Sequence, residues 1–273
     1  GCASGLESVV ERHRISRVVV ALEEHRGVLP MQSLLRLRVS GVEVEDSHST
    51  MAALTGRVPL QTLRSSWFIF SDGFHRTGWT EVVKRALDLS LGLLGLVLSA
   101  PIMALAAIAI KWDSEGPVLY RQTRVGRRGK PFDVLKFRTM GADAETNGIP
   151  QWAEEDDPRV TRLGRFLRKY RVDELPQFVN VIRGQMSFVG PRPERPVFVE
   201  ELGQIIPYYD ERHTVRPGIT GWAQVRYGYG GNTEEAMRKL EYDLFYLKNM
   251  SVWFDAAIVF ETVKIVMFGR GGR

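Results

Sequence analysis

Two adjacent acidic residues, Asp173 and Glu174, are the densest chemical signal in this 273-residue sequence. Arg168 lies five residues before Asp173, and Pro176 and Gln177 follow the acidic pair where the pattern predicts the start of a helix. In one interpretation Asp173 is an ordinary N-cap residue of that helix. In the other, the positive end of the helix keeps Asp173 ionised, close to incoming phosphates. An ionised carboxylate can attack phosphorus and adjacent carboxylates can hold Mg²⁺, so the spacing leaves a structural role and a catalytic role open.

Basic residues gather in two stretches around these carboxylates, from Arg121 to Arg171 and from Arg192 to Arg216, and the net charge is +5. Such clusters suit an anionic substrate or an anionic lipid surface. A nucleic-acid partner is not expected, because acidic residues are interleaved and no nucleic-acid-binding motif is present. Cys2 is the only cysteine, and the five histidines lack metal-ligand spacing. We therefore expect no disulfide framework and no zinc site.

An uncharged stretch of 22 residues, Leu89 to Ile110, is interrupted near its middle by Ser99, Ala100 and Pro101. A straight helix of that length rises about 33 Å, enough for a hydrocarbon core of roughly 30 Å. Pro101, however, lacks an N–H group and its ring clashes with the carbonyl of Val97, so we expect a kink or break. The two limbs would rise roughly 22 Å and 15 Å, and neither crosses a bilayer alone.

The charges beside this stretch favour a re-entrant helix, which enters and leaves the membrane on the same side. Lys84 and Arg85 precede the stretch, while Lys111 and several arginines follow it, so both flanks fit the cytoplasmic side. The Ser99 hydroxyl could satisfy a carbonyl freed at the break. We expect a re-entrant helix-break-helix over residues 82–111. A kinked spanning helix and a buried core helix of a soluble protein are the alternatives.

The first part of the chain predicts an α/β unit. Residues 17–22 form an apolar run typical of a buried strand, a helix is expected after Pro30, residues 41–46 alternate like a second strand, and residues 47–54 predict another helix. This order belongs to a parallel sheet, but no Gly-x-Gly-x-x-Gly loop is present. A structural, oligomerising or regulatory role is therefore favoured over nucleotide binding.

Beyond residue 111 the sequence predicts loops, short elements and five helices, namely Thr161–Lys169, Leu175–Arg183, Pro193–Gly203, Thr233–Lys248 and Val252–Phe268. The last helix is strongly apolar but carries Asp255, Glu261 and Lys264. Those charges predict an interfacial or packed amphipathic helix and not a second membrane span.

Eight blocks of sequence stand in a fixed order: Ser99-Ala100-Pro101, Gly116–Gln122, Lys136–Met140, Asp157–Gly164, Asp173–Gln177, Ser187–Pro193, Arg216–Trp222 and Tyr242-Asp243. In these blocks the chain resembles the monotopic polyprenyl-phosphate phosphoglycosyl transferases, also called bacterial sugar transferases. The resemblance implies an α+β, membrane-associated transferase domain over residues 80–273. It also implies that residues 1–75 are part of a nucleotide-binding-like, Rossmann-like α/β domain. Residues 1–75 resemble the latter half of the domain that precedes the transferase in large members of the family, and the chain begins at Gly1 without a secretory signal, so we expect a large-type member truncated at its N-terminus.

The resemblance implies transfer of a phospho-sugar from a UDP-sugar to a polyprenyl (undecaprenyl) phosphate, with UMP released. In this family the residue matching Asp173 is the nucleophile and forms a covalent phospho-sugar intermediate. Asp173 and Glu174 would hold Mg²⁺, or Glu174 would act as a base. The setting implied is the cytoplasmic face of the bacterial inner membrane, in contact with lipid, at the first membrane step of exopolysaccharide or other glycoconjugate synthesis.

Cations are expected to hold the phosphate oxygens in such a reaction. Arg168 is the first candidate, and Arg192, stiffened by a proline on each side, is the second. Lys136 and Arg138 could contact phosphates or the membrane surface, and a structural role is equally open. Asp243 becomes a candidate for phosphate or nucleotide binding through the resemblance alone.

Two other functions stay open from the sequence. The chain could be a non-catalytic membrane-bound scaffold or regulator of a polysaccharide assembly complex, in which Asp173 only caps a helix. It could also be a spanning transferase that has a metal site but no covalent intermediate. The sequence identifies neither the sugar nor the oligomeric state, a homodimer included.

Overall fold

The structure, a computed structural model, describes residues 5–21, 29–63, 65–71, 73–74, 77–141, 157–227 and 232–268. The chain divides into two compact units, Gly1–Ser71 and Asp72–Arg273. Each unit has helices and strands of its own, and the two are described separately below.

The first unit contains the predicted order of strand, helix, strand and helix. Its elements are α1 (Leu6–His13), β1 (Arg17–Val20), α2 (Met31–Val39), β2 (Glu43–Asp46), α3 (Ser47–Thr55), the 3₁₀ turn η2 (Leu60–Thr62) and α4 (Ser65–Phe70). β1 and β2 pair in parallel, with Arg17 opposite Glu43. The carboxylate of Asp46 accepts hydrogen bonds from the His48 and Ser49 N–H groups, so the last residue of β2 also caps α3.

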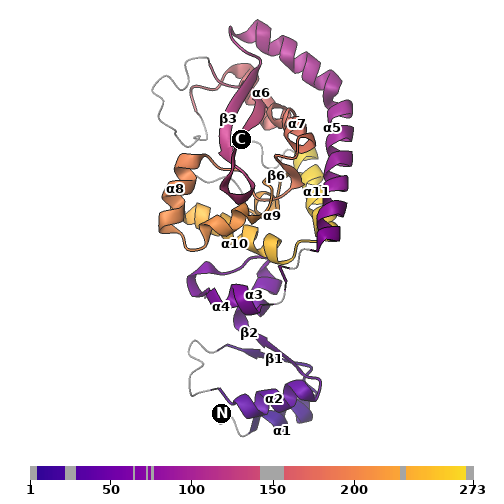
Figure 1. Cartoon of the computed structure of the whole chain (residues 1–273), viewed down its shortest axis with the longest axis vertical. Helices are drawn as coiled ribbons and strands as arrows, with labels where there is room; N and C mark the ends of the chain where they lie inside the picture. The colour runs from indigo at the N-terminus through magenta and orange to yellow at the C-terminus, as the bar shows by residue number, and fades with distance from the viewer. Residues whose placement is uncertain are drawn as a thin grey trace. The chain divides into compact units, whose positions relative to one another are not determined.

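The second unit begins with the long apolar helix α5 (Gly78–Asp113). The Thr77 hydroxyl caps its first turn by accepting from the Thr80 N–H. Among the described residues α5 alone is long and apolar enough to cross a membrane, judged by length and composition. Pro101 lies inside it. Figure 1 shows that α5 changes direction along its length, so the two predicted limbs are joined as one bent helix.

The first limb of α5 is bound to the rest of the unit through Lys84. Its ammonium group donates to the Asp255 carboxylate, to the Tyr246 hydroxyl at 3.0 Å and to the Val189 carbonyl at 3.1 Å. The side chains of Lys84 and Asp255 are only 17% and 14% exposed. The charge of Lys84 is thus neutralised inside the protein.

Two further polar residues of this limb bind neighbouring elements. The Arg85 guanidinium donates to the last carbonyls of a short helix, those of Val181 and Ile182, at 2.7 Å and 2.9 Å. The buried carboxylate of Asp88 accepts from the Ser187 hydroxyl at 2.8 Å and from the Phe188 N–H, also at 2.8 Å. Lys84 and Arg85 therefore bind groups inside the protein. Their positive charges are not evidence that this flank lies on the cytoplasmic side of the membrane.

The remaining elements of the second unit alternate short strands with helices (Figure 1). They are β3 (Leu119–Val125), the 3₁₀ turn η3 (Arg127–Gly129), β4 (Pro131–Phe137), α6 (Arg162–Lys169), the 3₁₀ turn η4 (Val172–Glu174), α7 (Gln177–Ile182), β5 (Ser187–Val189), α8 (Pro196–Ile205), the 3₁₀ turn η5 (Tyr209–Thr214), β6 (Gly218–Thr220), α9 (Trp222–Arg226), α10 (Thr233–Lys248) and α11 (Val252–Met267). β3 and β4 form an antiparallel hairpin, whereas β5 and β6 pair in parallel. This mixture of helices and strands fits the predicted α+β class.

Apolar packing ties the second limb of α5 to the elements around the acidic pair. Ala106 and Ile110 of α5 pack with Phe137 of β4 and Leu167 of α6, and Val172 of η4 packs against the same cluster. The residue directly before Asp173 therefore rests on the hydrophobic core that α5 helps to build.

The last helix, α11, packs on the core with one face as predicted, but its exposed face is also largely apolar, so the predicted amphipathic pattern is wrong. Ile258 is fully buried in a cluster with Val189 and Tyr246, while the opposite face leaves Trp253 86% exposed and Phe260 65% exposed. One face of α11 thus belongs to the core of the unit and the other carries exposed aromatic side chains.

Candidate active site

Helix α6 is fixed against the end of the β3–β4 hairpin, and this places Arg168. The Thr161 hydroxyl caps α6 by accepting from the Gly164 N–H at 2.9 Å. A Cβ atom on Gly164 would lie 2.0 Å from the Thr139 carbonyl oxygen, so only glycine permits this contact. Arg168 in turn donates through Nε to the Thr139 hydroxyl at 3.0 Å.

The chain reverses directly after α6 and presents the acidic pair. Arg171 has a φ of 55°, in the left-handed region that non-glycine residues seldom adopt. Asp173 and Glu174 follow in the short turn η4, and they are 8% and 7% exposed. The helix α7 starts only at Gln177, without a side-chain cap. The N-cap interpretation of Asp173 is therefore wrong, because Asp173 lies within η4 and caps nothing.

Glu174 is surrounded by three cations. Its Oε1 atom accepts from Arg192 at 2.8 Å and from Lys136 at 3.2 Å, and its Oε2 atom lies 3.5 Å from Arg171. Burial acts to raise the pKa of Glu174, but the three positive charges outweigh it and hold that pKa well below its usual value. Glu174 is thus an ionised carboxylate at neutral pH.

Asp173 is in the opposite situation. In the part of the chain that the structure describes, no hydrogen bond or ion pair reaches its carboxyl group. Burial, followed by the negative charge of Glu174, raises the pKa of Asp173 to about 6, against the opposing effect of Lys136, Arg168 and Arg192. Asp173 is therefore unpaired, and with a pKa of about 6 its carboxyl is largely ionised at pH 7.

Two of the predicted site residues, Arg138 and Asp243, bind partners other than the acidic pair. Arg138 donates to the carbonyls of Ser114 and Glu115 and so holds the chain at the end of α5. Asp243 on α10 is 1% exposed and pairs with Arg212 at 2.8 Å. Burial raises the pKa of Asp243 to about 6 even though Arg212 acts to lower it.

The structure thus brings together five of the seven predicted site residues, namely Asp173, Glu174, Lys136, Arg168 and Arg192. It adds Arg171, which the sequence analysis did not single out. The available signal was its position two residues before Asp173 in a cation-rich run. Its left-handed backbone, which turns the side chain to Glu174, could not be foreseen because arginine rarely adopts it.

The donor set around the acidic pair suits Mg²⁺ and not a metal held by many side chains. Among the described residues no cluster of three or more His, Cys, Asp or Glu side chains could hold a metal ion. Mg²⁺ commonly takes one or two carboxylates and completes its shell with substrate phosphates and water. The unpaired carboxyl of Asp173 fits that role, whereas Glu174 is already occupied by three cations.

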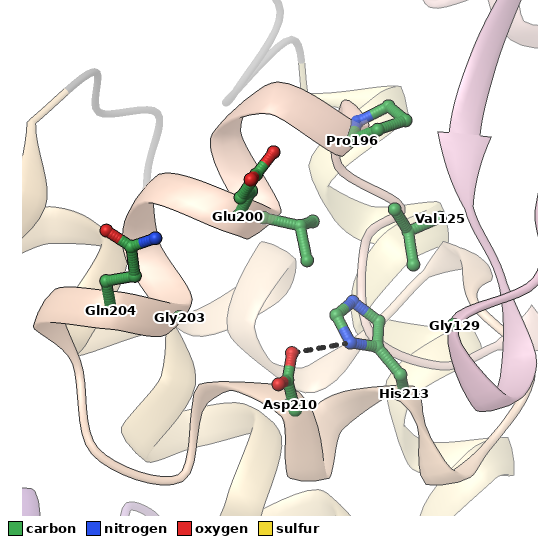
Figure 2. Close-up of a pocket in the computed structure, with 9 residues that line it drawn as sticks. Val125, Gly129, Pro196, Glu200, Gly203, Gln204, Asp210 and His213 are labelled. Carbon is green, nitrogen blue, oxygen red and sulfur yellow. Dashed lines mark ion pairs between the residues drawn. The ribbon is translucent and has the colours of Figure 1, made fainter.

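A separate hollow of about 460 Å³ lies between α8, η5 and the turn of the β3–β4 hairpin (Figure 2). Its lining includes Glu200, Asp210 and His213 but neither residue of the acidic pair. Figure 2 shows the imidazole of His213 beside Asp210. The distance from His213 Nδ1 to Asp210 Oδ1 is 3.6 Å. Burial and the nearby Arg212 lower the pKa of His213 to about 4, so this imidazole is neutral at pH 7. With two carboxylates and a neutral histidine, the hollow does not suit phosphates.

Known proteins similar to this chain share the region that contains the acidic pair. Residues 79–269 match the family model described as Bacterial sugar transferase. A UDP-N-acetylgalactosamine-undecaprenyl-phosphate N-acetylgalactosaminephosphotransferase of Aeromonas hydrophila is 40% identical over 240 residues, which are 88% of this chain and 56% of the relative. A UDP-glucose:undecaprenyl-phosphate glucose-1-phosphate transferase of Escherichia coli K12 is 47% identical over 190 residues, 68% of this chain and 40% of the relative.

A transferase with the same name from Caulobacter vibrioides is 48% identical over 186 residues, 67% of this chain and 69% of the relative. The chain spans about half the length of the first two relatives. The family match covers α5 except its first residue, the acidic pair and all four surrounding cations. On that match the chain belongs to the bacterial sugar transferase family.

Proposed function

We propose that this chain transfers a phospho-sugar from a UDP-sugar to a polyprenyl phosphate such as undecaprenyl phosphate. The observation that carries the proposal is the contrast within the acidic pair, where Asp173 is buried and unpaired while Glu174 holds three cations beside it. This arrangement offers a nucleophile next to a positively charged site for phosphates. The activities named for the relatives support the same donor and acceptor classes.

The reaction would run as two displacements at one phosphorus atom. An oxygen of the Asp173 carboxylate attacks the phosphorus that carries the sugar, the bond to the bridging oxygen breaks, and UMP leaves. The product is an aspartyl phospho-sugar. A phosphate oxygen of the polyprenyl phosphate then attacks the same phosphorus, which restores Asp173 and yields a polyprenyl diphosphate sugar. Two displacements through an enzyme intermediate predict ping-pong kinetics.

Cations stabilise the phosphate oxygens in each displacement, because the transition state of phosphoryl transfer is loose and its negative charge is spread over several oxygens. Arg192, Lys136 and Arg171 contact Glu174, and Arg168 acts on Asp173 through its charge. We assign these four side chains to the diphosphate of the donor. Their fixed positions mean that little reorganisation is needed during the reaction.

Glu174 has the role of an anchor for these cations. A carboxylate whose pKa is held well below its usual value is a weak base. The acceptor phosphate, with a second pKa of about 6, is also largely ionised at neutral pH and needs little help to lose a proton. Glu174 therefore orders Lys136, Arg171 and Arg192 for the incoming phosphates.

Asp173 would hold Mg²⁺ together with the phosphates of the donor, since its carboxyl has no other partner among the described residues. The ion supplies positive charge that neutralises the phosphate oxygens and favours the ionised form of a carboxyl whose pKa is about 6.

We further propose that α5 is a re-entrant helix in the bacterial cytoplasmic membrane, with the acidic pair on the cytoplasmic face. The bend of α5 supports this topology (Figure 1). Its second limb packs through Ala106 and Ile110 under Val172, so the acidic pair lies close to the limb that returns from the bilayer. A polyprenyl phosphate keeps its tail in the bilayer and its headgroup at the surface, where this arrangement would meet it. The resemblance places such a reaction at the first membrane step of exopolysaccharide or other glycoconjugate synthesis.

The proposed function is tested by intact-protein mass spectrometry of the full chain in detergent, mixed with Mg²⁺ and UDP-sugars but without acceptor. UDP-glucose and UDP-N-acetylgalactosamine are tried first, since the relatives differ in the sugar their names carry. We expect a mass gain of one phospho-sugar that is absent from Asp173→Asn. The matched control is Asp210→Asn, whose side chain is 81% exposed and which should keep the gain.

Two outcomes would contradict the proposal. UMP release that occurs only with polyprenyl phosphate, without any mass gain, would indicate a single displacement and no covalent intermediate. Neither mass gain nor UMP release with any UDP-sugar would favour the non-catalytic scaffold.

A further inference from the structure

Arg192 lies on a segment whose backbone is held at every residue. Each carbonyl from Pro191 to Glu194 accepts a hydrogen bond from a distant part of the chain. The donors, in chain order of the carbonyls, are the Gly218 N–H at 2.9 Å, Arg212 Nη2 at 3.1 Å, Arg124 Nη1 at 3.1 Å and the Val125 N–H at 2.9 Å. Two residues of the segment are prolines, which further restrict the backbone.

The side chain that donates to the Arg192 carbonyl is a buried cation. Arg212 is 5% exposed, and its Nη2 atom donates both to the Arg192 carbonyl and to the Asp243 carboxylate at 2.8 Å. Its Nη1 atom donates to the hydroxyl of Tyr209 at 2.7 Å. Asp243 and Tyr209 are 1% and 2% exposed, so the guanidinium is enclosed by partners that fix its orientation.

A continuous path of contacts therefore joins α10 to the acidic pair. It runs from Asp243 to Arg212, from Arg212 to the Arg192 carbonyl, and from the Arg192 guanidinium to Glu174 at 2.8 Å. A buried ion pair is weak evidence of a gain in stability, because the desolvation of both charges offsets their attraction. Here the pair also holds the backbone from which a cation of the site projects.

We propose that Arg212 and Asp243 are positioning residues that set the guanidinium of Arg192 for the phosphates of the donor. The inference rests on the proposed function and gives Asp243 a role other than direct contact with substrate. Asp243 is too deeply buried to reach a bound nucleotide. Shifts of about 1 Å in a catalytic group can lower a rate about a hundredfold, so a fixed carbonyl at Arg192 has a direct kinetic consequence.

A double-mutant cycle tests the proposal by the rate of UMP release from the full chain, with a reactive UDP-sugar and polyprenyl phosphate. The four proteins are wild type, Arg192→Ala, Asp243→Asn and the double variant. We expect Asp243→Asn to raise the KM for the UDP-sugar and to lower kcat/KM about tenfold or more. The double variant should be no slower than Arg192→Ala alone, because Asp243 acts through Arg192. Multiplied losses in the double variant would overturn the proposal.

Asp88→Asn is the matched control, since Asp88 is also a buried aspartate but holds Ser187 and not the Arg192 segment. Its effect should multiply with that of Arg192→Ala and leave the KM unchanged. Tyr209→Phe is the second variant of the network, because it removes one hydroxyl and keeps both buried charges. Introduced alone, Tyr209→Phe should raise the KM for the UDP-sugar. Combined with Arg192→Ala, it should have no further effect.

The outcomes separate the two proposals. An inactive wild type with every UDP-sugar contradicts the proposed function. If the wild type is active, but the effects of Asp243→Asn and Tyr209→Phe multiply with that of Arg192→Ala, only the positioning role is contradicted.

Discussion

Asp173 and Glu174 are neighbours in the chain, yet their carboxyl groups lie in opposite electrostatic surroundings. Glu174 forms ion pairs with Lys136, Arg171 and Arg192, while Asp173 forms an ion pair with none of these three. The pKa of Glu174 is therefore held well below its usual value, and that of Asp173 is raised to about 6. Within an acidic pair, such a separation assigns the permanent anion to one residue and the titrating carboxyl, which we propose as the nucleophile, to the other.

The first prediction concerns the pH dependence of adduct formation. Asp173 must be ionised to attack, so kcat/KM for the UDP-sugar should rise with pH through a midpoint near 6 when Mg²⁺ is limiting. In Glu174→Gln the neighbouring negative charge is lost and three cations lose their partner. Both changes favour ionised Asp173, so the midpoint should move to lower pH while the maximal rate falls. Mass spectrometry of the adduct between pH 4.5 and 8 measures it, at roughly half-unit steps.

Glu81→Gln is the control for this profile, because Glu81 pairs with Arg127 at the protein surface. It should leave the midpoint in place. A midpoint that stays near 6 or rises in Glu174→Gln would contradict the contribution of the Glu174 charge to the raised pKa of Asp173.

The second prediction is that the carboxyl of Asp173, the proposed nucleophile, reduces the stability of the folded protein. The pKa of Asp173 is raised from 3.8 to about 6 in the folded state, so its ionisation there is unfavourable. Its contribution to the free energy of unfolding is highest below pH 4 and declines as pH rises through 6. Asparagine does not ionise. Asp173→Asn should match the wild type near pH 4 and exceed it at pH 7 by on the order of 2 kcal/mol.

Urea unfolding in detergent, with EDTA and without donor, measures this difference. Asp210→Asn, at an exposed position, should show no pH-dependent gain. If Asp173→Asn unfolds more easily than the wild type at pH 7, Asp173 has a stabilising partner and the unpaired state is incorrect.

The helices around the site could be predicted because their start signals are local. The sequence predicts helices that begin at Thr161, Thr233 and Val252, and the structure has α6, α10 and α11 there, with Thr161, Asn232 and Ser251 as their N-caps. Each of the three side chains accepts from the N–H three residues ahead, at 2.9 Å, 2.8 Å and 3.2 Å. A cap and the hydrophobic spacing behind it lie within one segment, so sequence reasoning can reach them.

Contacts between distant segments could not be predicted in the same way. The three-residue strands β5 and β6 pair across about thirty residues and carry too little pattern to be recognised. Lys136 and Arg138 are two residues apart, yet one meets Glu174 and the other holds the end of α5. Which cation faces which acceptor is set by tertiary packing, and the sequence left both roles open for each.

The third prediction addresses the bend of α5. Pro101→Leu restores an N–H group and removes the ring that opposes a straight helix. A straight helix of 36 residues would rise about 54 Å, well beyond a hydrocarbon core of roughly 30 Å. We expect the variant to span the membrane and to lose the packing of Ala106 and Ile110 against Phe137, with loss of UMP release.

Single cysteines at Trp79 and Trp112, in a Cys2→Ser background, report this topology in sealed vesicles. Both positions are exposed, at 74% and 86%. A membrane-impermeant thiol reagent should reach both from the same side in the parent, and from opposite sides in Pro101→Leu. Ile102→Leu is the control and should keep the parental result. Labelling from opposite sides in the parent would contradict the re-entrant topology and show that α5 spans the membrane.

The fourth prediction concerns the attachment of α5 to the rest of its unit. Lys84 and Asp255 form a pair whose side chains are less than one-fifth exposed, and Lys84 also donates to Tyr246. Lys84→Met leaves a buried carboxylate without its cation, which should cost about 3 kcal/mol of unfolding free energy at pH 7. Burial already raises the pKa of Asp255 against the effect of Lys84, and the variant raises it further. The loss should therefore shrink as pH falls and Asp255 takes up a proton.

Urea unfolding at pH 5 and pH 7 tests both the size of this loss and its direction with pH. Lys264→Met is the matched control, because Lys264 and Glu261 are nearly half exposed and such pairs contribute about 0.5 kcal/mol or less. Adding Asp255→Leu to Lys84→Met should recover most of the loss, since it removes the stranded charge. A loss in Lys84→Met that is independent of pH, or that the second substitution does not relieve, would mean that Lys84 stabilises the unit through packing of its aliphatic stem.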